Sequence, residues 1–476
     1  MMRTLHWFRE DLRITDNTAL YYATNQTDEG CLAVYIITPK TWLDHDMAPC
    51  RVDFILRGLH VLNEQLMRFN IPFLIQIVDS FFDIPDLLLT ICHKYKIDAV
   101  YFNKQYEVNE LERDHKVSSL LKLHGTAVYS YHDQTIIEPQ LIRSKQNTAF
   151  TVYGFYRKAW VAYYQQNPVS LLPLPRQQSK PVSLITPTIF PSEIPGFDNS
   201  IKSDYWPSGE IAAKKRLDYF IANIISDYKI NRDIPSIDGT SKLSPYLACG
   251  MISARQCLEA AVRFNQSQLA SGNEGAMQWL DELIWREFYK MILVYFPRVS
   301  RHKPFKLNTD KLNWLNNEEY FSAWKRGNTG FPLVDAAMRQ LQETGWMHNR
   351  LRMVAAMFFS KQLWLDWRLG ERFFMQNLID GDLAANNGGW QWCASTGNDA
   401  APYFRIFNPI TQSQRFDPEG RFIRQYCPEL NHLDNTAIHQ PYAKHDIFST
   451  SLHYPQPIVD YKSTREEAIK QFKNLK

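Results

Sequence analysis

The chain has 476 residues, 45% of them hydrophobic and 22% charged, a globular composition with enough length for more than one core. Its net charge is +3, but residues 1–200 hold 19 Lys and Arg against 21 Asp and Glu, whereas the remainder holds 34 against 29. This mild basic bias permits contact with a polyanion, although a dedicated basic tail would give a stronger one.

The seven cysteines are scattered and show no C-x-x-C spacing, which indicates neither a disulfide framework nor a zinc site and favours a reducing compartment. The opening MMRTLHWFREDLR carries acids and arginines where a signal peptide needs an apolar core, and no apolar run approaches ~20 residues. We therefore expect a cytoplasmic protein without membrane contact.

The first 132 residues alternate between short apolar, β-branched or aromatic runs and segments with helical periodicity. The runs are TLHWF, CLAVYIIT, PFLIQIVD, AVYFNKQY and TAVYSYH. Five strands separated by helices predict a Rossmann-like α/β domain with a parallel sheet over residues 1–132. Because no G-x-G-x-x-G follows the first run, the usual dinucleotide fingerprint is absent.

Residues 133–209 are predicted to form an interdomain linker, since the stretch from Asn167 to Gly209 is rich in Pro, Ser and Gln. Beyond it the periodicity becomes helical in segments such as GAMQWLDELIWREFYKMILVYF and HNRLRMVAAMFFSKQLWL. Residues 210–476 are therefore predicted to form an all-α domain.

Tryptophan is concentrated in this second domain, where nine of the 13 fall between Trp279 and Trp392. Taken singly, each is best interpreted as an amphipathic residue at the edge of a helical core. As a set, they make a site that binds flat aromatic ligands a competitive hypothesis.

Two predicted helices each place a hydrogen-bonding group between flat or soft apolar side chains. In WLDELIWREFY, Glu282, Trp285 and Tyr289 share one helix face at i, i+3 and i+7. In WMHNRLRMVAAM, the matching stripe would be Trp346, Asn349 and Met353. The alternative is an ordinary helix surface, with the carboxylate solvated and the amide acting as a cap.

The segment NNGGWQWCASTGND reads as a loop, because Asn-Asn-Gly-Gly breaks regular structure, and it carries Trp390 and Trp392. Together with the two stripes, these indoles predict a pocket for a flat heteroaromatic such as a nucleobase, whose faces stack on Trp at roughly 1 to 3 kcal/mol each.

Two further segments supply polar groups. DGTSKLSPYLACG offers Thr240, Ser241 and Ser244 at a predicted helix start, where they either cap the helix or bind an anion such as a diphosphate. LIDGDLAANNGG clusters two aspartates and an asparagine near two arginines, which favours a salt-bridged structural or cofactor site over a metal site.

Seven motifs together resemble the DNA photolyase and cryptochrome family, and most closely its bacterial class I cyclobutane pyrimidine dimer members of the folate type. They are WFREDLRITDN, GTSKLSPYLACG, ELIWREFY, GWMHNRLRM, DWRLGERFF, DGDLAANNGGWQWCASTGNDAAPYFRIFNP and YPQPIV. The similarity runs from Thr4 to about Asp460.

The resemblance implies FAD bound in the helical domain. Its phosphate side matches Tyr228, Thr240, Ser241, Lys242, Leu243 and Ser244. The flavin and adenine side matches Trp279, Glu282, Arg286, Asn349, Arg352, Asp380, Asp382 and Asn386. In this alignment Arg352 pairs with Asp380, and Asn386 faces the flavin N5.

The resemblance also implies a lesion pocket, contacts to DNA and a chain of three tryptophans that passes electrons to the flavin. The lesion pocket matches Glu282, Trp285, Asn349, Arg350, Met353 and Trp392. Arg232 and Arg405 match phosphate contacts, while Trp390, Trp367 and Trp314 match the electron-transfer chain.

Members of this family also carry a light-harvesting antenna in the amino-terminal domain. The positions that hold methenyltetrahydrofolate match His45, Asn109, Glu110, Ser300 and Arg301. Comparable members carry Cys and Lys at the positions of Ser300 and Arg301. Arg301 keeps the positive charge of the lysine but differs from it in the shape of the charged group. Folate is the expected antenna and a deazaflavin the alternative.

The function implied is light-dependent repair of UV-damaged DNA, in which photoexcited reduced FAD (FADH⁻) sends an electron to a flipped-out pyrimidine dimer. Glu282 is expected to hydrogen-bond the dimer with a carboxyl of raised pKa. The alternatives are a cryptochrome-type blue-light receptor without repair activity and a flavin-binding electron-transfer protein without a DNA partner. A six-four photolyase would place His where Asn349 and Met353 stand. A monomer is expected.

Overall fold

The computed structural model describes residues 2–183, 188–442 and 452–475. Part of the predicted linker, residues 184–187, lies outside these ranges. No helix in the described part of the chain is long and apolar enough to cross a membrane.

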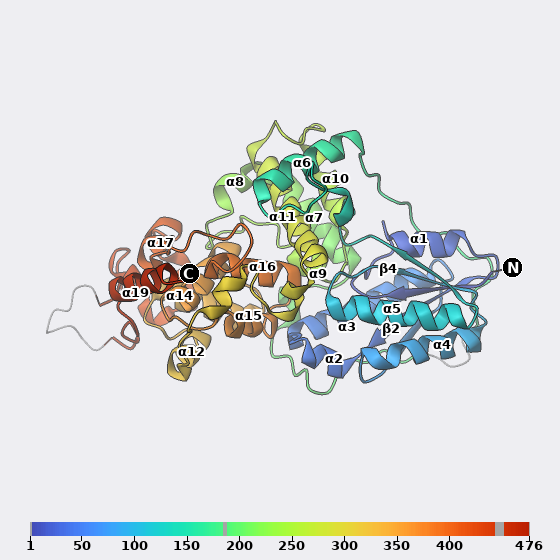
Figure 1. The fold of residues 1–476 in the computed structure, drawn as a ribbon, viewed down its shortest axis with the longest axis horizontal. Helices are drawn as coiled ribbons and strands as arrows, with labels where there is room; N and C mark the ends of the chain where they lie inside the picture. Colours follow the sequence, from blue (N-terminus) through green and yellow to red (C-terminus); the bar gives the residue numbers. More distant parts are fainter. Residues whose placement is uncertain (1, 184–187, 443–451, 476) are drawn as a thin grey trace.

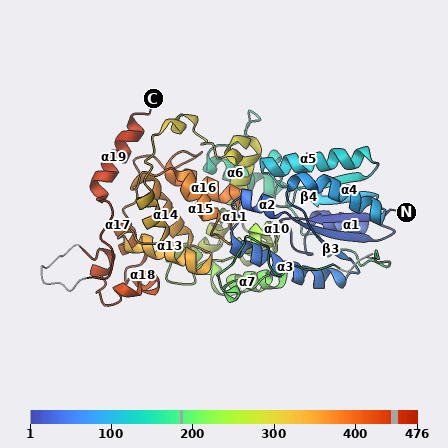
Figure 2. The ribbon, with the colours of Figure 1, turned by 90° about the horizontal axis from the view of Figure 1, so that it is seen from below.

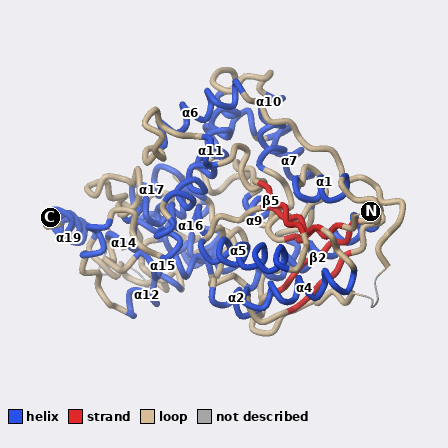
Figure 3. Tube along the Cα trace, turned by 45° about the vertical axis from the view of Figure 1, so that its right-hand side comes forward, coloured by secondary structure: helices blue, strands red, loops and turns tan. Residues whose placement is uncertain are grey.

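The predicted five-stranded parallel sheet is confirmed, with strand order β3-β2-β1-β4-β5. The strands are β1 (Thr4–Phe8), β2 (Cys31–Ile37), β3 (Phe73–Ile77), β4 (Ala99–Asn103) and β5 (Ala127–Tyr131). Strands β1, β2 and β4 are buried along their whole length because helices cover both faces of the sheet, which explains why their sequences are mostly apolar. Figure 3 shows the strands gathered at one end of the molecule.

Five helices belong to this domain: α1 (Thr18–Asn25), α2 (Pro39–Asp44), α3 (Pro49–Met67), α4 (Ile84–Tyr95) and α5 (Val108–Leu123). The chain leaves β1 in one direction, toward β2 and β3, and later returns on the other side to form β4 and β5. Loops at the carboxyl ends of β1 and β4 therefore diverge, which opens a crevice at this switch point.

The remainder is helical and forms the other end of the molecule, with the C-terminal helix farthest from the sheet (Figures 1 and 2). Its helices are α6 (Tyr153–Gln166), α7 (Glu210–Asn223), α8 (Tyr228–Asn231), α9 (Ser244–Ala248), α10 (Ala254–Phe264), α11 (Glu274–Tyr295), α12 (Glu318–Lys325), α13 (Pro332–Thr344), α14 (Asn349–Lys361), α15 (Trp367–Met375), α16 (Leu383–Ala394), α17 (Pro409–Phe416), α18 (Arg421–Tyr426) and α19 (Tyr461–Lys473). The long helix α11 contacts α6, α8, α10 and α16, and so forms the centre of this body.

Helix α6 lies within the stretch predicted as linker, yet it packs against α11. Its Tyr156 and Trp160 are fully buried, and the Trp160 indole N–H donates to Glu287 on α11 over 3.4 Å. Extended chain then follows, and its Gln178 N–H donates to the Phe69 carbonyl beyond α3.

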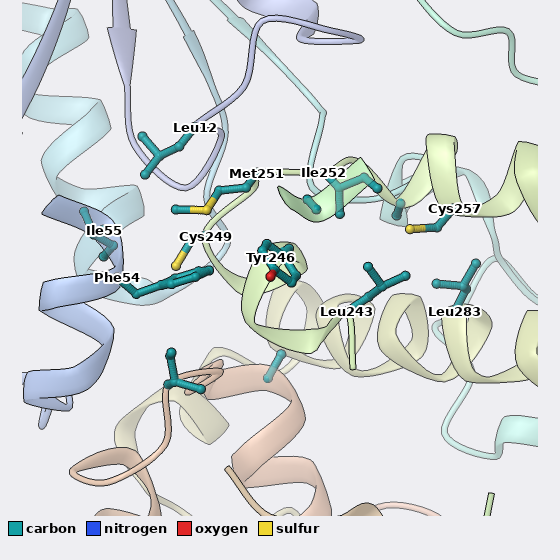
Figure 4. Packing of buried hydrophobic residues seen from close by; sticks show 14 of the residues in the cluster. Leu12, Phe54, Ile55, Leu243, Tyr246, Cys249, Met251, Ile252, Cys257 and Leu283 are labelled. Atoms are coloured by element: carbon teal, nitrogen blue, oxygen red, sulfur yellow. The ribbon is translucent and has the colours of Figure 1, made fainter. Parts of the chain in front are cut away.

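One hydrophobic core joins the sheet domain to the helical body. Figure 4 shows Phe54 and Ile55 of α3 facing Tyr246 of α9 and the following Cys249 and Met251. Because the core is continuous, the two parts pack as one unit.

Candidate functional site

A central cavity of about 680 Å³ lies between α8, α11, α14 and α16, within the size range of cofactor sites. Most of its polar and aromatic lining comes from residues singled out in the sequence. These are Arg232, Glu282, Trp285, Arg286, Tyr289, Asn349, Arg350, Arg352, Met353, Asp380, Asp382, Asn386, Trp390 and Trp392. The sequence prediction missed five further polar or aromatic residues that line it: Lys229, Asp233, Gln278, Phe374 and Cys393.

The predicted stripe on α11 is confirmed, since Glu282, Trp285 and Tyr289 all line the central cavity. The Trp285 ring lies flat on Tyr153 of α6, with centroids 3.6 Å apart and planes 8° from parallel. Tyr153 therefore fixes the plane of this indole, so that its edge and other face remain for a ligand.

The second stripe is confirmed only in part. Helix α14 begins at Asn349, so Asn349 and Met353 line the cavity but Trp346 precedes the helix. The Trp346 indole instead donates to the Ser244 hydroxyl over 3.2 Å. The amide is not the helix cap either, because His348 holds that position and its Nδ1 accepts from the Arg350 N–H.

The loop predicted for residues 386–394 is wrong, because these residues belong to α16. Asp382 caps this helix by accepting the Ala385 N–H over 2.9 Å. A Cβ added at Gly388 would lie 2.3 Å from the Tyr289 ring, so glycine allows α16 to approach α11 closely. Tertiary packing thus overrides the weak helix propensity of the Asn-Asn-Gly-Gly run.

The helix sends the two indoles of α16 in different directions, as residues two apart lie roughly 200° around a helix. Trp390 is buried against Phe359 and Phe374, with ring centroids 5.6 and 5.0 Å away. Trp392 is only partly buried and forms a wall of the cavity.

Glu282 is the central acid of the cavity. Its carboxylate pairs with Arg232 and accepts from the Gln278 amide over 3.2 Å. Burial raises the pKa of Glu282, and the guanidinium of Arg232 opposes that rise. The raised direction agrees with the sequence expectation.

The other two acids that were singled out each have a cation. Arg352 donates to Asp380 over 2.7 Å, which confirms the predicted pair, and Lys290 lies 2.7 Å from Asp382. The second oxygen of Asp380 is buried and has no hydrogen-bond partner among the described residues. Asp380 lines the central cavity, so this unpaired acceptor lies at the border of a site with room for a ligand.

The predicted phosphate-side residues lie outside the lining of the central cavity. Helix α9 has only five residues and Leu243 holds its cap position, so none of Thr240, Ser241 and Ser244 is the cap residue. The Ser241 hydroxyl does accept from the Leu243 N–H over 3.4 Å at this helix start. Lys242 pairs with Asp238 over 3.0 Å. The remaining two phosphate-side residues, Tyr228 and Leu243, are buried in the core, as is Trp279 from the predicted flavin and adenine side. The predicted DNA contact Arg405 is exposed outside the cavity.

A second cavity of about 360 Å³, called here the interdomain cavity, lies in the crevice at the strand ends. All five predicted antenna residues line it: His45, Asn109, Glu110, Ser300 and Arg301. The His45 ring lies 2.9 Å from the Asn109 amide and 3.5 Å from Glu110. Burial, with Glu107 as a second cause, raises the pKa of Glu110 to about 8.

Two family models match the chain: the DNA photolyase model over residues 4–177 and the model of the FAD binding domain of DNA photolyase over residues 279–474. A relative from Escherichia coli (strain K12), named deoxyribodipyrimidine photo-lyase, is 41% identical over 472 residues, which are 98% of both chains. The chain belongs to the DNA photolyase family.

Solved structures of the family share this fold. A cryptochrome from Synechocystis is 27% identical with a TM-score of 0.89, and 99% of each chain is covered. An archaeal photolyase from Sulfolobus tokodaii, which holds two FAD molecules, is 29% identical with a TM-score of 0.83, covering 99% of this chain and 100% of that one. The matched FAD-binding region contains most of α11 and all of α14 and α16, which frame the central cavity.

The three tryptophans predicted to transfer electrons belong to, or pack against, one hydrophobic cluster of the helical body. Trp367 and Trp390 are buried in one hydrophobic cluster, and Trp314 packs against it from a more exposed place. Trp314 also pairs with Trp364, with ring centroids 4.8 Å apart. Their role stays a prediction.

Proposed function

We propose that this member of the photolyase family repairs cyclobutane pyrimidine dimers in DNA with light, using FAD bound in the central cavity. The observation that carries the proposal is one shared cavity, in which Glu282, Trp285, Asn349 and Met353 lie beside the pair Arg352–Asp380. The E. coli relative named for this activity supports it over full length.

The residues present fit a flavin. The buried free oxygen of Asp380 suits a ring N–H, and a Cβ at Gly389 would meet nothing within 4 Å, so the backbone of α16 borders open space. Bound in its reduced form, FAD supplies the electron that light sends to the dimer and that returns after the ring opens. The phosphate-side residues Tyr228 to Ser244 remain part of the proposal.

The chain's own groups bind and orient the lesion. Photolyases are among the enzymes that flip their target out of the duplex, and Trp285 and Trp392 offer faces and edges for the extruded bases. Glu282, when protonated, donates a hydrogen bond to a dimer carbonyl and stabilises the negative charge that arises there. Arg232 and Arg350, now paired with Glu282 and Asp233, are placed to exchange these carboxylates for DNA phosphates.

The deciding experiment mixes the reduced holoprotein with an oligonucleotide that carries one thymine dimer and measures restored thymines after blue light and in the dark. Restoration only in the light supports repair. A fully reduced, flavin-loaded protein that restores none would favour the receptor function instead, because the fold is shared with a cryptochrome.

Glu282→Ala should lower the repair yield per absorbed photon several-fold and leave dimer binding much less affected. The carboxyl acts on the charged intermediate, whereas its loss frees Arg232 for phosphate contact. Quantum yield and DNA affinity are measured in parallel, with Glu274→Ala at the exposed start of α11 as control. Equal losses of yield and affinity would contradict this role.

We further propose a methenyltetrahydrofolate antenna in the interdomain cavity, since the five matching residues line it together. The archaeal neighbour with a second FAD shows that this fold accepts other light-harvesting groups. Gently purified protein should therefore show near-ultraviolet absorption beyond that of flavin. Glu110→Ala should remove this band and keep the flavin, whereas the exposed Glu112→Ala should keep both; a protein with flavin absorption alone would contradict a bound antenna.

We also propose that the protein acts as a monomer in the cytoplasm. All seven cysteines are free and buried, which suits a reducing compartment.

A further inference from the structure

The central and interdomain cavities share a wall. It consists of the segment Asp380–Asp382 before α16 and of Lys290 on α11, and the Asp382 side chain lines both cavities. Each end of the wall therefore contacts a different ligand site through the same few residues.

Lys290 is the buried cation inside this wall, with 1% of its side chain exposed. Its ammonium lies 2.7 Å from Asp382 and 3.2 Å from Glu107, which precedes α5 and lines the interdomain cavity. Burial opposes the charge on Asp382, yet Lys290 and Arg286 hold its pKa well below the usual range. Lys290 thus pairs with two carboxylates, Glu107 on the interdomain cavity and Asp382 on both cavities.

A second cation reaches the same segment from the interdomain side. Arg51 of α3 donates to the Gly381 carbonyl and pairs with Glu10 over 2.7 Å. On the central side, Arg352 holds Asp380. Each of the three residues 380–382 therefore contacts a buried or partly buried cation, Arg352, Arg51 or Lys290.

We propose that Lys290 couples the two cavities, so that an occupant of the interdomain cavity that donates a hydrogen bond to Glu107 stabilises reduced flavin in the central cavity. This inference rests on the proposed binding of FAD. When the occupant donates a hydrogen bond to Glu107, the ion pair between Glu107 and Lys290 weakens. The ammonium of Lys290 then lies closer to Asp382, and the electrostatic potential in the central cavity becomes more positive. Because coupling between sites is reciprocal, reduction of the flavin in turn favours the occupant.

The test is the midpoint potential of flavin in the holoprotein, measured by spectroelectrochemical titration. Glu107→Gln removes the competing charge and should raise the potential, while Lys290→Met should lower it. The expected shift corresponds to a change of roughly 5- to 150-fold in the relative affinity for reduced and oxidised flavin. Glu112→Gln removes the same charge from an exposed place on α5 and should leave the potential unchanged.

The double variant Glu107→Gln/Lys290→Met separates coupling from direct charge effects, since the Glu107→Gln shift should largely vanish without Lys290. If Lys290→Met does not fold, Lys290→Arg replaces it in the cycle and should retain the Glu107→Gln shift. An unchanged potential in Glu107→Gln, or the same shift with and without Lys290, would overturn the proposal. A chain that binds FAD but repairs nothing would refute only the repair function, whereas a chain that binds no FAD would refute both.

Discussion

Trp285→Ala should weaken binding of dimer-containing DNA roughly 5- to 150-fold, since stacking of a base on an aromatic ring contributes about 1 to 3 kcal/mol. The indole lines the central cavity and Tyr153 holds it in one plane, so its stacking surface is preorganised and costs little side-chain entropy on binding. Trp285→Phe should retain part of the affinity.

Undamaged DNA provides the internal control for this variant. Its bases stay stacked in the duplex and do not reach Trp285, so its weaker, phosphate-driven binding should be unchanged and should keep its dependence on salt. Both affinities are measured by titration of labelled duplexes, and retained flavin absorption shows that the site is intact. An equal loss for damaged and undamaged DNA would place Trp285 outside the lesion pocket.

Much of the fold could be predicted from the sequence where local pattern and burial agree. The runs TLHWF and AVYFN are mostly apolar because both faces of β1 and β4 are covered, and this pattern predicts the parallel sheet but not the order of its strands. The stripe of Glu282, Trp285 and Tyr289 could also be predicted. In a helix of 22 residues, the helical periodicity places these three side chains on one face whatever packs against it.

The failures occur where distant contacts decide the structure. From local sequence, Gly388 predicts a break in the helix. The structure shows that the ring of Tyr289, about a hundred residues earlier, leaves no space for a side chain at this position. Lys290 follows Arg286 by one helical turn, but no local pattern shows that its partners are Glu107 and Asp382. Sequence identified the residues of the site, whereas the partners that fix their charge and direction came from the structure.

Arg255→Met should lower the free energy of unfolding by about 3 to 5 kcal/mol, the usual effect of removing one partner from a buried ion cluster. Arg255 on α10 donates to Asp16 over 2.9 Å and to Asp133 over 2.6 Å. Arg13 completes the cluster by donating to Asp133 over 2.5 Å. Asp16 follows β1 and Asp133 follows β5, whereas Arg255 lies in the helical domain. The variant therefore leaves a buried carboxylate charge uncompensated at the interface between the two domains.

The matched control is Arg263→Met on the same helix, because Arg263 is exposed and pairs only with Glu259 one turn away. Such a surface pair contributes about 0.3 to 0.5 kcal/mol. Urea unfolding, followed by far-ultraviolet circular dichroism and by tryptophan fluorescence, measures both variants. A loss in Arg255→Met no larger than in Arg263→Met would mean that water reaches the cluster and screens it.

The same cluster gives stability a defined dependence on pH. Burial alone would raise the pKa of Asp133, but Arg13 and Arg255 hold it well below the ordinary value. A carboxyl with a lowered folded-state pKa stabilises the protein fully above its unfolded pKa of about 3.9, and this contribution is lost as the pH falls further. As the pH falls from about 5 to 3, the free energy of unfolding should therefore decrease less in Arg255→Met than in the parent protein. The reason is that the variant has already lost the part of the stabilisation of charged Asp133 that Arg255 supplies. Parallel acid-unfolding curves for the two proteins in that interval would contradict the assignment of the cluster as the charged link between sheet and helices.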